Sequence, residues 1–104
     1  MTPKRIQRKR AKGWRMPAGA VYVGRPTKWG NPFNVTATQS REVAIARYRW
    51  WLTRGLPGST GILPAQPTEI RTLRGKDLAC WCPLDQPCHA DVLLELANAE
   101  EVTR

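Results

Sequence analysis

The residues best suited to chemistry lie together between positions 80 and 91, where the sequence reads CWCPLDQPCHAD. This stretch contains all three cysteines and the only histidine of the chain. Cys88 and His89 stand where a final helix is expected to begin, and a helix N-terminus lowers a thiol pKa and favours an anion. We therefore predict a catalytic site of Cys88 as nucleophile, His89 as acid, base or phosphate donor, and Asp91 as helix cap or partner of His89.

Two other interpretations of this stretch stay open. Cys80, Cys82, Cys88 and His89 are residue types that bind zinc, but we expect the side chains of Cys80 and Cys82 to point away from each other on their strand. An adjacent Cys-His pair also fits poorly with the ligand spacings that zinc sites favour. In the other interpretation the thiols are buried apolar groups, with Cys80 in the core, and the histidine only caps a helix. The sequence thus predicts no cofactor, with zinc as the alternative.

The loop VGRPTKWGNPF, residues 23–33, is a second candidate site. Its glycines let the backbone approach a ligand closely, its two cationic side chains can pair with phosphate, and its tryptophan offers a flat face for a base or sugar. A rigid turn with Trp29 and Phe33 packed in the core is compatible with the same pattern. The residues assigned to binding in this loop are Gly24, Arg25, Lys28, Trp29, Gly30 and Asn31.

The basic residues are concentrated in the first half of the chain. Of the 17 lysines and arginines, 13 fall in residues 1–54 against one acid, whereas residues 55–104 hold four against seven acids. Such polarity attracts anions to one side of a protein. Basic residues interleaved with an aromatic near the N-terminus suit a nucleic-acid backbone, although a solvated arm is equally consistent. The phosphate contacts predicted there are Arg5, Arg8, Arg10, Lys12 and Arg15, with Trp14, Trp29 and Trp81 as candidates for stacking on a base.

The elements that must position these residues alternate between strand and helix. Ala20–Val23 and Asp77–Cys82 read as short strands, and Gln39–Arg54 as a helix with Thr38 or Ser40 as its cap. In this helix Ala44, Tyr48, Trp51 and Leu52 form the expected buried stripe, and Arg41 and the other arginines lie largely outside it. The remaining helices are expected at Glu69–Arg74, capped by Thr68, and from Cys88 or His89 to Ala99, with Val92, Leu93, Leu96 and Ala97 as the buried face of the last one. This order predicts an α/β fold with a short parallel or mixed sheet and flanking helices, made of a basic arm over residues 1–16 and one domain over residues 17–104. Both candidate loops then fall at the carboxyl ends of strands, where ligands bind.

Several classes are excluded by what the sequence lacks. No apolar run approaches the ~20 residues that span a bilayer, and the basic N-terminus has no apolar stretch typical of a secretory signal. An odd number of clustered cysteines favours reduced thiols, hence a cytoplasmic protein without membrane association. Neither a phosphate-binding P-loop nor a zinc-deaminase pattern is present, and the single histidine has no identifiable serine partner.

The same motifs carry a family resemblance that covers nearly the whole chain. Arg5–Arg8, Lys12–Arg15, Val23–Pro26, Trp29–Phe33, Leu78–Cys82 and Cys88–Asp91 together are similar to the DUF4326 family of phage and bacterial proteins. Ala90 stands where that family's Cys-His-Gly-Asp signature has glycine. The resemblance implies a self-contained cytoplasmic domain with these motifs at its site, and it supplies no activity.

The residues themselves therefore decide the functional prediction. They favour a small protein that binds nucleic acid or a nucleotide through its basic N-terminal half. One alternative is a small enzyme that acts on a nucleotide, a nucleobase or its sugar through Cys88, His89 and Asp91. Another is an interaction protein with a corner held together by zinc.

Overall fold

The computed structural model describes residues 3–25, 27–33 and 35–99, and Ser59 without its side chain. Within these residues the chain forms a three-stranded sheet of β1 (Arg5–Gln7), β2 (Val21–Tyr22) and β3 (Leu78–Cys80). The strand order is β1-β3-β2 and both pairings are parallel, so β3 is central. The predicted α/β fold with a short parallel sheet is confirmed. Pro26 of the loop motif lies outside the described residues. The same holds for residues 1–2 and 100–104 at the two ends of the chain.

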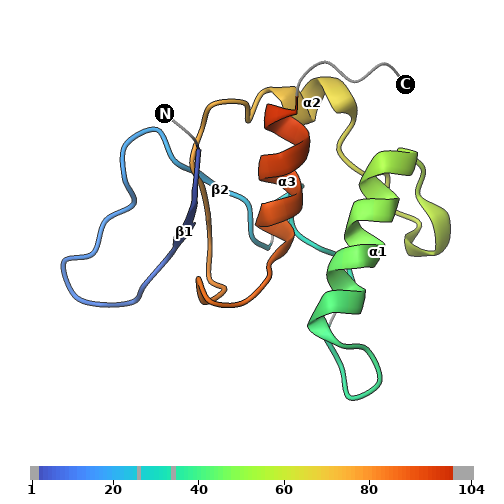
Figure 1. The fold of residues 1–104 in the computed structure, drawn as a ribbon, viewed down its shortest axis with the longest axis horizontal. Helices are drawn as coiled ribbons and strands as arrows, with labels where there is room; N and C mark the ends of the chain where they lie inside the picture. The colour runs from blue at the N-terminus through green and yellow to red at the C-terminus, as the bar shows by residue number, and fades with distance from the viewer. Residues whose placement is uncertain (1–2, 26, 34, 100–104) are drawn as a thin grey trace.

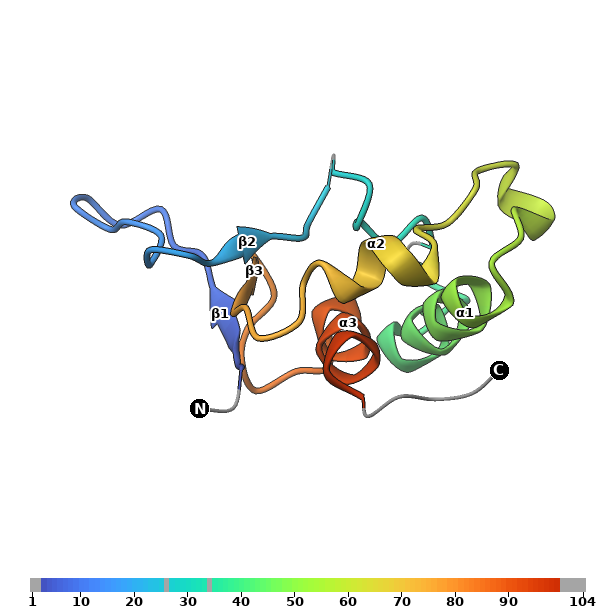
Figure 2. The same cartoon turned by 90° about the horizontal axis from the view of Figure 1, so that it is seen from above.

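The described residues also form three α-helices, α1 (Arg41–Arg54), α2 (Pro67–Arg71) and α3 (His89–Asn98), with a 3-10 turn at Gly58–Thr60. Figures 1 and 2 show α3 between the sheet and α1, with α2 across one end. The central helix α3 accordingly contacts β1, β3, α1 and α2. Within the part of the chain that the structure describes, no helix combines the length and apolar character needed to cross a membrane.

Local signals fix both ends of α1. The Ser40 hydroxyl accepts a hydrogen bond from the Val43 N–H, which caps the helix, and Gly55 ends it at a φ of 72°, in the left-handed region that glycine tolerates best. The predicted apolar stripe of Ala44, Tyr48, Trp51 and Leu52 is buried. The helix prediction over 39–54 is therefore confirmed to within two residues.

The third helix is the one that positions the cysteine corner. It begins at His89 with Cys88 as N-cap, and the Asp91 carboxylate accepts a hydrogen bond from the Cys88 N–H at 3.0 Å. Val92, Leu93 and Ala97 are buried against the sheet and the other helices. The predicted start and buried face of this helix are confirmed, so packing of α3 fixes where the Cys88 and His89 side chains can lie.

The N-terminal segment differs from the expected arm. Arg5–Gln7 is an edge strand of the sheet, and Arg8 continues the pairing through its N–H to the Cys80 carbonyl at 2.7 Å. Only the following loop, residues 9–20, projects from the body of the protein (Figure 2). The first basic residues are therefore part of the sheet, because a parallel partner 73 positions away satisfies their backbone groups.

The short second helix begins earlier than predicted. It spans Pro67–Arg71, and its N-cap is Gln66 rather than Thr68. The Gln66 N–H donates to the Glu69 carboxylate at 3.1 Å, and Pro67 occupies the first helical turn, where a missing N–H costs nothing. A capping box built on glutamine was the signal that the sequence interpretation did not use.

Candidate functional site

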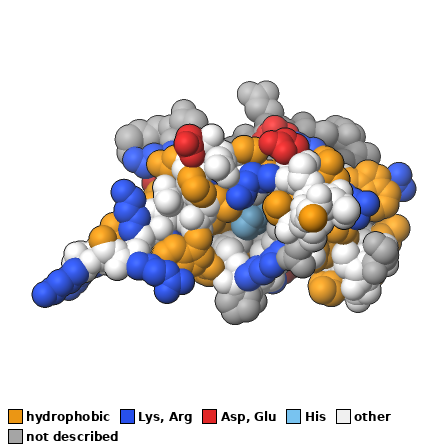
Figure 3. Space-filling view, turned by 90° about the horizontal axis from the view of Figure 1, so that it is seen from below, with side chains coloured by type: hydrophobic (Ala, Val, Ile, Leu, Met, Phe, Trp, Pro, Cys, Tyr) orange, Lys and Arg blue, Asp and Glu red, His pale blue; other side chains and the backbone are white. Residues whose placement is uncertain are grey.

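A pocket of about 550 Å³ opens between the sheet and α1, within the usual volume range of small-molecule sites. Its walls are formed by residues at the carboxyl ends of β2 and β3 and in the first turns of α1. The loops after β2 and β3, which the sequence analysis singled out, therefore both contribute to it. Figure 3 shows the single histidine of the chain inside this hollow, with Lys and Arg side chains around it. The lining residues are Tyr22, Gly24, Arg25, Asn31, Phe33, Val35, Arg41, Ala44, Ile45, Cys80, Trp81, Cys82 and His89.

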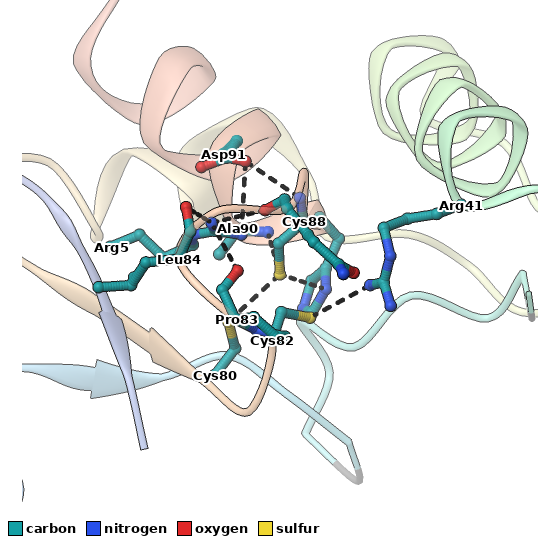
Figure 4. Close-up of polar contacts among 11 residues, drawn as sticks. Arg5, Arg41, Cys80, Cys82, Pro83, Leu84, Cys88, Ala90 and Asp91 are labelled. Carbon is teal, nitrogen blue, oxygen red and sulfur yellow. Dashed lines mark hydrogen bonds and ion pairs between the residues drawn. The ribbon is translucent and has the colours of Figure 1, made fainter. Parts of the chain in front are cut away.

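Three cysteine sulfurs converge at one wall of the pocket. The Sγ atoms of Cys80, Cys82 and Cys88 all lie within 4.8 Å of one another, and those of Cys80 and Cys88 are 3.2 Å apart (Figure 4). The sequence argument that Cys80 and Cys82 point to opposite faces was wrong, because residues two positions apart on a strand share a face, and β3 in any case ends at Cys80. The chain turns after this residue and brings the Cys82 sulfur back beside the other two.

Hydrogen bonds among the three thiols shift the pKa values of Cys80 and Cys88 in opposite directions. The pKa of Cys88 is lowered, first by hydrogen bonding from the thiols of Cys80 and Cys82, and then by the Ala90 N–H and Arg5. The pKa of Cys80 is raised, chiefly because it hydrogen bonds to Cys82 and Cys88 and is buried. Cys88 is thus the sulfur that carries negative charge, but it is only 1% exposed and does not line the pocket. Its burial disfavours the nucleophilic role predicted for it.

Arg5 holds the loop between these cysteines. Its Nη2 atom donates to the carbonyl oxygens of Pro83, Leu84 and Gln86 at 2.6–3.1 Å. Its Nη1 atom is 3.5 Å from Asp91 Oδ2 and makes no hydrogen bond within the described residues. The Arg5 side chain is 8% exposed. Arg5 and Asp91, predicted for phosphate binding and catalysis, therefore position the cysteine loop and the start of α3.

His89 lines the pocket and has both ring nitrogens engaged. Its Nε2 lies 2.7 Å from the Val23 carbonyl, which can only accept, so Nε2 carries the proton and Nδ1 the lone pair. Nδ1 is 3.5 Å from Cys88 Sγ. Burial lowers the pKa of His89, which keeps the ring neutral. The geometry leaves Nδ1 able to accept a proton from a thiol or to bind a metal.

These positions belong to a recognised family of domains. A family model described as "Domain of unknown function (DUF4326)" matches residues 6–99. The chain belongs to this family. No curated protein and no solved structure matches it. The match includes β1 from Ile6 onward, both candidate loops and all of α3, so the three cysteines and the pocket lie inside the DUF4326 domain.

The glycine-rich loop of this DUF4326 domain is held chiefly by its own side chains. Arg25 donates through Nε and Nη2 to the Asn31 carbonyl at 2.9 and 2.6 Å, and Tyr22 Oη donates to the Arg25 carbonyl at 2.6 Å. Trp29 is 6% exposed and belongs to the core, so it has no free face for a base. Lys28 pairs with Glu69 at 2.8 Å, outside the pocket lining. Of the predicted loop contacts, Gly24, Arg25 and Asn31 reach the pocket.

The remaining basic residues divide between the pocket rim and the projecting loop. Arg8 lies over the rings of Tyr22 and Trp81, and Arg10 lies over Trp81, each 4.7 Å from the ring centroid. Trp81 is 39% exposed and lines the pocket. The projecting loop leads away from the pocket, and on it Lys12 and Arg15 are exposed and Trp14 is half-buried. Trp81 is therefore the predicted stacking residue that a pocket ligand could reach.

Sequence reasoning missed Arg41 as a site residue. It was placed among the arginines outside the buried stripe of its helix. The structure puts Arg41 in the first turn of α1, with Nη1 donating to Cys82 Sγ at 3.8 Å (Figure 4). A basic residue in the first turn runs against the helix dipole, and that local conflict was the available signal. Tyr22 and Phe33 were also missed as pocket-lining residues, because the sequence pattern places Tyr22 in a strand and Phe33 in the core.

Gly24 leaves room for Tyr22. A Cβ at position 24 would lie 2.4 Å from Tyr22 Oη and 2.7 Å from its Cζ, although the backbone there needs no left-handed conformation. Gly24→Ala is therefore expected to displace the Tyr22 ring, break its hydrogen bond to Arg25 and lower the free energy of unfolding by about 1 kcal/mol. Urea denaturation measures the change. In a Tyr22→Ala background the same substitution should change the free energy of unfolding only a little. An equal decrease in both backgrounds would contradict this account.

Proposed function

We propose that this DUF4326 domain binds a nucleotide in the pocket between the sheet and α1. The single observation that carries the proposal is that one cavity is lined both by two arginines, Arg25 and Arg41, and by two aromatic side chains, Trp81 and Phe33. Guanidinium groups bind phosphate oxygens through directed hydrogen bonds. An aromatic face supports a nucleobase by stacking.

The electrostatics of the protein favour an anionic ligand. The net charge is +9, and the acids that pair with Arg5 and Lys28 are Asp91 and Glu69. None of the described aspartates and glutamates lines the pocket. Arg41 interacts only with the half-buried Cys82 thiol among its described contacts, so its charge is available to a phosphate.

A free nucleotide fits these observations better than a long nucleic acid. The cavity has the volume of a small-molecule site, and its lining combines apolar side chains with a few polar ones. The exposed cations of the projecting loop, Lys12 and Arg15, would add contacts only to a ligand that extends beyond the pocket. Reduced thiols support a cytoplasmic setting for this binding. Because the Cys88 sulfur is buried outside the cavity, we propose binding and not thiol catalysis.

Arg41→Gln tests the phosphate contact. The variant is expected to bind nucleotide about tenfold more weakly, because a charge-assisted hydrogen bond contributes on the order of 1.5 kcal/mol to binding. The measurement is a titration with nucleoside mono-, di- and triphosphates followed by tryptophan fluorescence. Arg47→Gln is the matched control, since it makes the same charge change on an exposed face of the same helix. Equal weakening by both variants would show a diffuse charge effect and would contradict a phosphate contact at Arg41.

The same titration identifies the stacking residue and the ligand class. Trp81→Phe should remove most of the fluorescence change, whereas Trp50→Phe, at an exposed position on α1 that does not line the pocket, should preserve it. Saturable binding of one nucleotide with weak salt dependence supports the pocket. Steeply salt-dependent binding to an oligonucleotide, without binding of free nucleotides, would replace this proposal with surface binding by the projecting loop.

A further inference from the structure

We propose that Cys80, Cys82 and Cys88 bind one zinc ion in the wall of the pocket, with the fourth coordination position facing the cavity. This inference is independent of nucleotide binding, because it rests on the three sulfurs and on the groups that hold them. It also reverses the expectation from the spacing of the cysteines, which disfavoured a metal.

The sulfur positions fit a single ion. Thiolates about 2.3 Å from a shared tetrahedral zinc lie about 3.8 Å from one another. The three Sγ atoms are all within 4.8 Å of one another, and the closest pair is 3.2 Å apart, so an ion at their centre requires adjustments of tenths of an ångström to about 1 Å. Two come from the end of β3 and the turn after it, and the third from the N-cap of α3, so the site joins the sheet to the helix.

The surrounding groups suit a thiolate cluster. The Ala90 N–H points at Cys88 Sγ at 3.5 Å, and Arg41 donates to Cys82 Sγ at 3.8 Å. Three thiolates and one Zn²⁺ leave a single net negative charge, which Arg5 and Arg41 can balance. Arg5 has a buried Nη1 that makes no hydrogen bond among the described residues, and it holds the intervening loop through three carbonyl contacts. Groups that orient metal ligands in this way are a regular part of zinc sites.

A disulfide explains the arrangement less well. It would join two of the sulfurs at about 2.05 Å and leave the third without a role, whereas all three thiols are free and turned toward one another (Figure 4). Cys80 and Cys82 line the pocket, as does His89, whose Nε2–H donates to the Val23 carbonyl. That hydrogen bond is the one a zinc-ligating or zinc-facing histidine makes with its other nitrogen. Three protein ligands with a fourth position toward a cavity is the pattern of an accessible zinc site.

The test begins with the full chain, expressed with added zinc and purified under reducing conditions without chelator. Elemental analysis should give about one zinc per chain. After removal of the metal, titration with Co²⁺ should give thiolate-to-cobalt charge-transfer absorption that saturates at about one equivalent, together with the visible bands of tetrahedral coordination. Cys82→Ser is the informative variant, because Cys82 is only half-buried and its replacement is the least disruptive to folding.

Cys82→Ser should hold less than about half an equivalent of zinc and lose much of the charge-transfer band, while its far-ultraviolet circular dichroism stays that of the parent. Arg47→Gln is the control, since Arg47 is exposed on α1 and is not among the groups around the sulfurs, and this variant should retain the metal. The proposal is overturned if folded parent protein binds neither zinc nor cobalt after reconstitution. Mass spectrometry that finds a Cys80–Cys88 disulfide resistant to reduction in the folded protein would overturn it equally.

Discussion

Replacing Arg5 with methionine is expected to lower the free energy of unfolding by about 3 kcal/mol. The substitution keeps most of the side-chain length but removes the donor to the carbonyl oxygens of Pro83, Leu84 and Gln86. It also leaves the Asp91 carboxylate without its cation. Because the Arg5 side chain is 8% exposed, water cannot readily replace these contacts. The loop between Cys82 and Cys88 should therefore lose its fixed position.

Denaturant unfolding followed by circular dichroism measures this effect, and the melting temperature should fall by about 4–8 °C for each kcal/mol. Lys9→Met is the matched control, because Lys9 is exposed in the same segment and the charge change is identical. It is expected to change the stability by less than about 0.5 kcal/mol. If the two variants were equally stable, Arg5 would have no positioning role, and its predicted assignment to phosphate binding would be favoured again.

The helices could be predicted because their signals are local. Ser40 and Gly55 mark the ends of α1, and the spacing of its apolar residues identifies its buried face. Cys88 at the start of α3 was placed correctly for the same reason. In α2 a local signal was available but misread, since Gln66 and not Thr68 forms the cap.

The sheet and the site depend on contacts that the sequence does not display. Arg5–Gln7 pairs with Leu78–Cys80, more than seventy positions away, and short strands of two or three residues carry little periodicity. The alternation rule was misapplied to Cys82, because residues two positions apart on a strand share a face. The spacing of Cys80 and Cys82 was therefore compatible with convergence, but the approach of Cys88 to them depends on how α3 packs in the core.

The same limitation applies to the basic residues. Composition correctly showed that positive charge gathers in the first half of the chain, but it could not separate structural from available cations. In the structure Arg5 is buried in carbonyl contacts, Arg8 lies over two aromatic rings, and Lys28 is paired with Glu69. Arg41, which the sequence did not single out, faces the pocket together with Arg25. A buried guanidinium and a ligand-binding one look alike in sequence, because only the fold decides which carbonyl or carboxylate lies within reach.

Tyr48 links the helix, the glycine-rich loop and the histidine of the pocket. Its hydroxyl donates to the Trp29 carbonyl at 2.6 Å, and its ring packs edge-on against His89 at 5.3 Å between centroids. The side chain is fully buried. Burial, with a smaller contribution from the negative charge of Cys88, raises the pKa of the Tyr48 phenol, so the hydroxyl remains a donor at neutral pH.

Tyr48→Phe is accordingly expected to lower the free energy of unfolding by about 2 kcal/mol, because it leaves the Trp29 carbonyl buried without its donor. Tyr22→Phe makes the same chemical change at a half-buried position, where water can reach the Arg25 carbonyl, and should cost less than about 1 kcal/mol. Urea denaturation of the two variants gives the comparison. If nucleotide binding is as proposed, Tyr48→Phe should also weaken it, since the loop that carries Asn31 and Phe33 is held to α1 through this hydrogen bond. A cost no larger than that of Tyr22→Phe would mean that packing of Trp29 alone fixes the loop.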